Sequence, residues 1–309
     1  MNMPDNPYYR QMELLVRMLP SVTAEECFAL KGGTAINLFY HDLPRYSVDI
    51  DLTYMPIGPH DSACREIDAA LRRIGKRLSS GSPFFGVALG KSNSSGMIDT
   101  LRVDDSGAEI KIETNSVLRG AVYPARELEV KPGVKNEFGF ASANVLSRED
   151  VYAGKLVAAL DRQHPRDLFD VKLLFDTDGV SDALLRTFLV YLVGHRGSIP
   201  DVLAPRRKDI SRIYHEQFVR MTVEPVSLDA LLEIRERLIR EIHSRLDDKL
   251  KQFLLSVQRR EPEWTLLGLQ GVEELPAVKW RLLNLGKMSS ASLDREIMRL
   301  EGVLSGSNP

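Results

Sequence analysis

The stretch Lys31–Tyr54 reads KGGTAINLFYHDLPRYSVDIDLTY and ends in a strand-like run that carries two aspartates, Asp49 and Asp51. Aspartate is a poor strand former, and two like charges on one strand repel each other. Because side chains alternate along a strand, both carboxylates share one face while the aliphatic residues between them share the other. The pattern favours two carboxylates that bind a hard divalent cation, with a solvated strand face as the alternative.

The residues before this strand predict a binding site for phosphate groups. Lys31, Gly32, Gly33 and Thr34 stand between an apolar run, Cys27–Leu30, and a predicted helix. Glycines let the backbone approach a ligand, and a helix start offers N–H groups to an anion, with the threonine hydroxyl as a further donor. An ordinary turn is the alternative. A phosphate cradle beside a metal site indicates phosphoryl-transfer chemistry.

These features together resemble the DNA polymerase β-type nucleotidyltransferases, and among them the AbiEii and MenT group of toxins from toxin–antitoxin systems. The glycine pair, the spacer and the D-x-D carry the resemblance, which covers residues 25–176. Arg45 and Ser47 match the Arg-x-Ser-x-Asp-x-Asp run of this group, whereas Thr34 replaces the more usual serine. The resemblance implies a nucleotidyltransferase fold of the α+β class, a mixed β-sheet flanked by helices. It also implies Mg²⁺ or Mn²⁺ at Asp49 and Asp51.

A third carboxylate is expected from a neighbouring strand, as is usual in such folds. The run AEIKIETN (residues 108–115) alternates cleanly, and Glu113 lies at the end of its polar face. Glu113 is therefore our candidate for a further metal ligand or for the base that deprotonates an attacking hydroxyl. The alternative is a solvent-facing strand of alternating acids and bases.

A single lysine stands out in the run Val151–Leu160. Lys155 is the only charged residue there, and small or apolar residues surround it on both helix faces. An ammonium so placed suits a triphosphate, whereas a lysine that snorkels to the surface is the alternative. The resemblance supports a functional lysine, since these toxins carry one in the matching helix.

The motif Arg166-Asp-Leu-Phe-Asp170 follows a proline at a predicted helix start. An acid such as Asp167 in a first helical turn stabilises the helix dipole without any other role. It can also form an ion pair that only orients Lys155. The resemblance to the closing motif of the AbiEii group implies that Asp167 is catalytic, with Asp170 and Arg166 as companions.

The predicted nucleotide-binding residues thus come from several segments. They are Lys31, Gly32, Gly33, Thr34, Arg45, Ser47 and Lys155.

The rest of the chain is predicted to be helical. We expect a nucleotidyltransferase domain at residues 1–178, with short strands that include 84–90, 96–103 and 137–143, and a helical domain at residues 179–309. Within the helical domain, an apolar stripe predicts one long helix over Ser227–Arg259. A basic segment is a candidate RNA-binding site or a solvated turn. Its cations are Arg206, Arg207, Lys208 and Arg212.

Composition limits the cellular setting. The 309 residues have a formal net charge of −2, so any contact with nucleic acid must use a local patch. Only two cysteines are present, which fits a reducing cytoplasm. No apolar run reaches the length of a membrane span, and we expect no membrane partner.

The resemblance implies a toxin that transfers a nucleoside monophosphate from a nucleoside triphosphate to RNA. The expected acceptor is a tRNA 3′ end, which would block translation, and a cognate antitoxin is the expected protein partner. A transferase that acts on a small molecule or a protein hydroxyl remains an alternative, because the motifs specify donor and metal only. A non-catalytic interaction module is a further alternative.

Overall fold

The computed structural model describes residues 6–81, 85–93, 95–105 and 107–306 of the chain. They divide into two compact units. The first comprises Met1–Val151 and Gln217–Pro225, and the second Tyr152–Glu216 and Val226–Pro309. Residue 178, the expected domain boundary, falls inside the second unit. The assignment of the nucleotidyltransferase domain to residues 1–178 stays a prediction.

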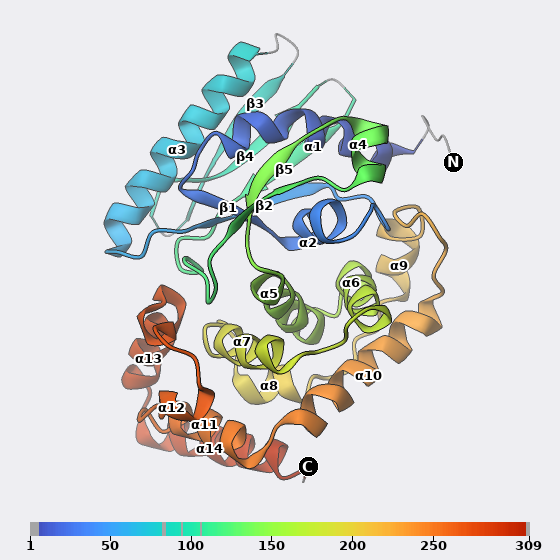
Figure 1. The fold of residues 1–309 in the computed structure, drawn as a ribbon. Helices are drawn as coiled ribbons and strands as arrows, with labels where there is room; N and C mark the ends of the chain where they lie inside the picture. Colours follow the sequence, from blue (N-terminus) through green and yellow to red (C-terminus); the bar gives the residue numbers. More distant parts are fainter. Residues whose placement is uncertain (1–5, 82–84, 94, 106, 307–309) are drawn as a thin grey trace. The chain divides into compact units, whose positions relative to one another are not determined.

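A mixed seven-stranded sheet is the frame of the first unit, and it confirms the predicted α+β class (Figure 1). The strand order is β3-β4-β5-β2-β1-β7-β6, in which β2 and β5 are parallel, as are β1 and β7, and the other neighbours are antiparallel. The strands are β1 (Phe28–Lys31), β2 (Asp49–Tyr54), β3 (Gly86–Lys91), β4 (Ile98–Asp104), β5 (Glu109–Glu113), β6 (Arg126–Glu129) and β7 (Ser142–Val145).

The alternation along β2 gives the sheet one apolar and one polar face. Ile50 and Leu52 are buried, as is Ile112 beside them on β5. The long helices α1 (Pro7–Thr23) and α3 (His60–Gly81) pack against the strands and supply the other half of this core (Figure 1). The aspartates of β2 therefore lie on the face that these helices leave uncovered.

A helix replaces part of one predicted strand. Residues 137–143 were expected to be extended, but Glu137 belongs to α4 (Pro132–Phe138), and β7 starts only at Ser142. A proline at the helix start favours the helix, and Gly139, with a φ of 99°, ends it. The prediction for residues 84–90 is confirmed from Gly86 onward, whereas residue 84 lies outside the described residues.

Helical elements follow β1 and close the first of the two chain segments that make up this unit. They are α2 (Gly32–Ala35), the π-helical turn η1 (Ile36–Tyr40) and the beginning of α5 (Arg148–Asp161).

A segment far along the chain completes the first unit. Residues 217–225, called the strap below, hydrogen-bond to the loop that precedes β2. The Tyr46 N–H donates to the Met221 carbonyl at 2.8 Å, and the Val223 N–H donates to the Pro44 carbonyl at 3.1 Å. Between them, Arg45 and Thr222 form an antiparallel bridge. The strap therefore fixes the backbone of the loop that carries Arg45.

The second unit is helical, as predicted, but the long helix expected over 227–259 is two helices. Asp247 separates them, because its side chain accepts a hydrogen bond from the Leu250 N–H and so caps a new helix. None of the helices in the described parts of the chain is long and apolar enough to span a membrane. The elements are α6 (Pro165–Asp176), α7 (Asp182–Val193), α8 (Ile199–Leu203), α9 (Ser211–Gln217), α10 (Leu228–Arg245), α11 (Asp248–Gln258), α12 (Trp264–Leu267), η2 (Val272–Glu274), α13 (Pro276–Lys287) and α14 (Ser290–Leu304).

Candidate active site

The glycine bend after β1 lies directly against a carboxylate of β2. Gly32 has a φ of 71°, in the left-handed region that favours glycine. A Cβ atom at this position would lie 2.2 Å from Oδ2 of Asp51 and 3.1 Å from its Cβ. Only a residue without a side chain lets the bend and the carboxylate approach so closely. The structure thus brings together the two motifs that the sequence predicts to share a substrate.

Arg45 covers the next residue of the bend. A Cβ atom on Gly33 would lie 2.5 Å from Nη2 of Arg45. The arginine is 2% exposed, and its Nη1 donates to the Tyr46 carbonyl at 2.9 Å. Its guanidinium is therefore held against the predicted phosphate cradle, as a nucleotide-binding residue requires.

The hydroxyls of Thr34 and Ser47 are used inside the protein. Both residues are buried, and Thr34 Oγ1 donates to the Asp49 carbonyl at 2.5 Å. The two hydroxyl oxygens are 2.7 Å apart. Since a hydroxyl has one proton, Ser47 must be the donor of this second bond. The Thr34 hydroxyl was predicted to donate to a phosphate. In the structure it donates to the Asp49 carbonyl and so links the start of β2 to the glycine bend.

Charged side chains form a row across three strands. Asp51 pairs in register with Lys31 on β1 and with Glu113 on β5, so all three lie on one face of the sheet. Lys111, in register with Asp49, forms an ion pair with Glu113. The structure therefore places the third predicted carboxylate beside the D-x-D, and also shows the acid–base pairing of the alternative interpretation.

Burial and the neighbouring carboxylates shift the pKa of Lys31 in opposite directions. Burial lowers the pKa of its ammonium, while the carboxylates of Asp51 and Glu113 act to raise it, with a net lowering. A partly desolvated ammonium beside these carboxylates neutralises part of their charge. Lys31 thereby lowers the repulsion that the D-x-D would otherwise create.

Donor chemistry decides which metal would fit this row. Asp49 and Asp51 offer carboxylate oxygens, the ligands that Mg²⁺ and Mn²⁺ prefer. Among the described residues, no three acidic, histidine or cysteine side chains converge as a metal site by themselves. The residues fit an ion that two carboxylates hold and that the phosphates of a substrate complete, as is usual for Mg²⁺.

A buried ion cluster lies at the junction of α5 and α6 in the second unit. Nζ of Lys155 is 2.7 Å from Oδ1 of Asp167 and 2.9 Å from Oδ2 of Asp170. The lysine side chain is 7% exposed, and both aspartates are fully buried. The structure thus brings these three predicted residues together, and the ammonium is oriented by both carboxylates.

Sequence reasoning missed a fourth member of this ion cluster. Nε and Nη2 of Arg162 donate to the two oxygens of Asp167 at 2.5 and 2.9 Å. Such a two-pronged contact fixes both groups, yet the arginine side chain remains 60% exposed. A cation just before a helix with an acid in its first turn was the available signal.

Arg166 and His164 form the N-terminal cap of α6. Nδ1 of His164 accepts the Arg166 N–H at 3.1 Å and so caps the helix. The cap fixes the first turn of α6, which carries Asp167.

The charge on Asp167 is stabilised by its partners. Burial alone would raise the pKa of this carboxyl, but Lys155 and Arg162 together hold it well below its usual range. The carboxylate is therefore ionised at every pH at which enzymes of this kind are assayed.

The Asp167→Asn variant is expected to reveal this pairing through its acid stability. The depressed pKa gives wild type a stability contribution that is complete above the unfolded value of 3.8 and is lost as pH falls toward the folded value. The difference in unfolding free energy between the two proteins should be constant above about pH 5 and shrink below about pH 4. Urea unfolding at a series of pH values measures it.

Asp176→Asn, in an exposed pair with Lys172, is the control and should show little change. A wild-type-to-Asp167→Asn difference that stays constant down to pH 3 would contradict the assigned pKa.

The basic segment of the second unit is mostly engaged with its own surroundings. Arg207 pairs with Glu236 at 2.9 Å, and Arg212 with Glu216 at 2.8 Å. Lys208 Nζ donates to the Asp161 carbonyl, while the segment as a whole stays exposed.

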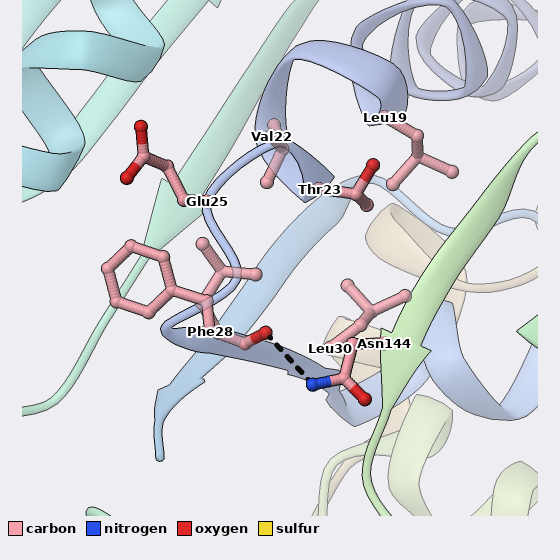
Figure 2. A pocket seen from close by; sticks show the side chains of 8 residues that line it. Leu19, Val22, Thr23, Glu25, Phe28, Leu30 and Asn144 are labelled. Carbon is pink, nitrogen blue, oxygen red and sulfur yellow. Dashed lines mark hydrogen bonds between the residues drawn. The ribbon is translucent and has the colours of Figure 1, made fainter. Parts of the chain in front are cut away.

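Two cavities of the first unit do not belong to the candidate site. One, of about 10 Å³, lies beside β1 next to the Asn144–Phe28 hydrogen bond and barely admits one water molecule (Figure 2). The other, of about 600 Å³, lies between the strap and the loop of Leu43 and Tyr46. None of the predicted site residues lines either cavity.

Comparisons with known proteins identify the family and the fold. The sequence profile of the family described as "Nucleotidyl transferase AbiEii toxin, Type IV TA system" matches residues 13–282. The fold is similar to that of MenT4, a nucleotidyltransferase toxin from Mycobacterium tuberculosis H37Rv, with a TM-score of 0.53 and 14% sequence identity. The match covers 98% of this chain and 94% of the MenT4 chain. No curated protein sequence matches the chain.

Proposed function

Because the chain belongs to the AbiEii family of nucleotidyltransferase toxins of type IV toxin–antitoxin systems, we propose that it transfers a nucleoside monophosphate to the 3′ end of a tRNA. A nucleoside triphosphate is the donor, and a cognate antitoxin is the protein partner that opposes the activity. Nucleotides and tRNA meet in the cytoplasm, where we place the reaction. The contact between Gly32 and Asp51 is the observation that carries the proposal.

The first unit would bind the donor. The backbone N–H groups of the half-buried Gly32 and Gly33 would donate to phosphate oxygens, and Arg45 beside them contributes a fixed positive charge. Asp49 and Asp51 would hold Mg²⁺, which when bound neutralises charge that develops on the phosphates. Lys31 balances the carboxylates when the substrate is absent.

The chemistry is one substitution at phosphorus. The acceptor hydroxyl oxygen forms a bond to the α-phosphorus, the bond to the bridging oxygen breaks, and pyrophosphate leaves. The hydroxyl proton needs an acceptor, and Glu113 is the carboxylate next to Asp51 that is available for it. Its ion pair with Lys111 holds the Glu113 carboxylate in place on this face of the sheet.

The ion cluster of the second unit holds two cations in fixed positions in this proposal. Asp167 and Asp170 compensate much of the charge of Lys155, so their main effect is to fix its ammonium. Arg162 has one edge on Asp167 and the rest exposed, which suits contact with a phosphate. We assign Lys155 to phosphate binding, Arg162 to a phosphate of the acceptor, and Asp167 to the orientation of both cations.

Asp49→Asn is expected to lower nucleotide transfer by roughly three orders of magnitude or more, because a carboxylate that would hold the metal is lost. The fold should be unchanged or more stable, since a like-charge repulsion is removed. Incubation with each labelled nucleoside triphosphate and total RNA, alongside a circular-dichroism melt, measures both effects.

Asp61→Asn, at an exposed position in the first turn of α3, is the matched control and should retain activity. Label that enters protein or a small molecule instead of tRNA would refute the acceptor. Undiminished transfer by Asp49→Asn would refute the metal site.

A further inference from the structure

Gln163 lies between α5 and α6 in an unusual backbone conformation. Its φ is 54°, in the left-handed region that non-glycine residues rarely adopt, and its side chain is 0% exposed. A strained and fully buried polar residue is retained only where the surroundings hold it firmly. The two residues beside it, Arg162 and His164, are those that pair with Asp167 and cap α6.

The carboxamide of Gln163 binds the backbone of the basic segment. Nε2 donates to the Arg206 carbonyl at 2.7 Å, and Oε1 accepts the Lys208 N–H at 3.0 Å. Oε1 also accepts Nη1 of Arg235 at 3.1 Å, and that same nitrogen donates to the Lys208 carbonyl at 2.9 Å. One side chain thus holds the segment on both sides of Arg207, and the buried Arg235 stabilises these contacts. We call this set of contacts the grip.

The grip fixes the backbone positions of three cationic residues. Arg206 and Lys208 are exposed on the gripped segment, and Arg162 is the exposed residue that precedes Gln163. Lys208 Nζ also donates to the Asp161 carbonyl at 2.8 Å, which holds it against the end of α5. The basic segment and the ion cluster are therefore anchored to the end of α5 and to the three residues that join it to α6.

We propose that Gln163 is a positioning residue that makes Arg162, Arg206 and Lys208 one continuous surface for the phosphate backbone of the RNA acceptor. The inference rests on the proposed transfer to RNA and specifies which residues hold that substrate. Exposed cations on two tethered segments suit a polyanion with repeated phosphates, because each contact releases a counterion. Gln163 touches neither substrate in this scheme and acts through the segment that it grips.

The Gln163→Gly variant tests the grip without adding strain, since glycine adopts the same φ freely. We expect the KM for tRNA to rise about tenfold, while the KM for the nucleoside triphosphate and the kcat at saturating tRNA stay within about twofold. A purely structural defect would lower kcat and both affinities together.

The double variant Arg206→Gln/Lys208→Gln tests the surface without disturbing the buried grip. The slope of log K for tRNA against log salt, from fluorescence anisotropy, should become shallower by about 1.4, at roughly 0.7 for each single-strand phosphate contact. Lys279→Gln, which removes an exposed cation paired with Glu274 elsewhere in the unit, is the matched control and should leave the slope unchanged.

The outcomes separate this inference from the proposed function. If wild type labels no RNA, the proposed function fails. If wild type labels tRNA but the double variant keeps the wild-type slope, the surface is wrong. If Gln163→Gly folds and keeps the wild-type KM for tRNA, the positioning role is wrong. If Gln163→Gly does not fold, the double variant alone decides, and an unchanged slope overturns the proposal.

Discussion

Replacing Lys155 with methionine is expected to lower the free energy of unfolding by about 3–5 kcal/mol, because buried carboxylates lose their ammonium partner. Asp167 and Asp170 are fully buried, and methionine occupies a similar volume without a charge. Arg162 still pairs with Asp167, which favours the lower end of this range. Urea unfolding at neutral pH measures the change.

Lys172→Met is the matched control for this prediction. Lys172 lies on α6 and pairs with Asp176 one turn later, but both side chains are partly exposed. Loss of such a pair costs about 0.5 kcal/mol or less. Adding Asp170→Asn to Lys155→Met should recover part of the stability, since one buried charge is removed. Equal effects of Lys155→Met and Lys172→Met would contradict the buried ion cluster.

Replacing Gly32 with alanine is expected to reduce nucleotide transfer at least about 100-fold. The new methyl group would start 2.2 Å from Oδ2 of Asp51, and a φ of 71° is unfavourable for alanine. Because the clash reaches the Cβ of Asp51 as well as its oxygen, rotation of the carboxylate alone does not relieve it. Transfer measured with saturating nucleoside triphosphate reports the loss.

Gly58→Ala is the control, since a Cβ atom there meets nothing within 4 Å and its backbone requires no positive φ. It should keep full activity and the wild-type melting temperature. A Gly32→Ala protein with wild-type activity would show that the bend tolerates a side chain and that it does not place Asp51 for catalysis.

Local signals in the sequence were enough for the glycine bend and the strand of Asp49 and Asp51. Glycine allows backbone conformations that other residues rarely adopt, and alternation of apolar residues assigns the faces of β2. The break between α10 and α11 has a local signal as well, the cap at Asp247, but the continuous apolar stripe on both sides obscured it. Periodicity reports burial, and two consecutive helices can share one buried stripe.

Contacts between distant segments could not be predicted. Nothing near Gln163 in the sequence shows that its amide meets the backbone of Arg206, or that Arg235 joins them. Likewise, nothing near Tyr46 shows that its N–H meets the Met221 carbonyl of the strap. Single-sequence patterns report residues within a few turns of each other, whereas these pairs form only when the chain folds.

The strap has a consequence for how the protein is made. Its Met221 carbonyl receives the Tyr46 N–H, and its Arg220 carbonyl receives the side-chain amide of Asn6. On a ribosome, which extends the chain from its N-terminus, the sheet emerges long before these partners do. The hydrogen bonds of the strap to the loop that carries Arg45 thus form only after translation has reached Pro225, so a nascent or prematurely terminated chain lacks these contacts beside the proposed donor site.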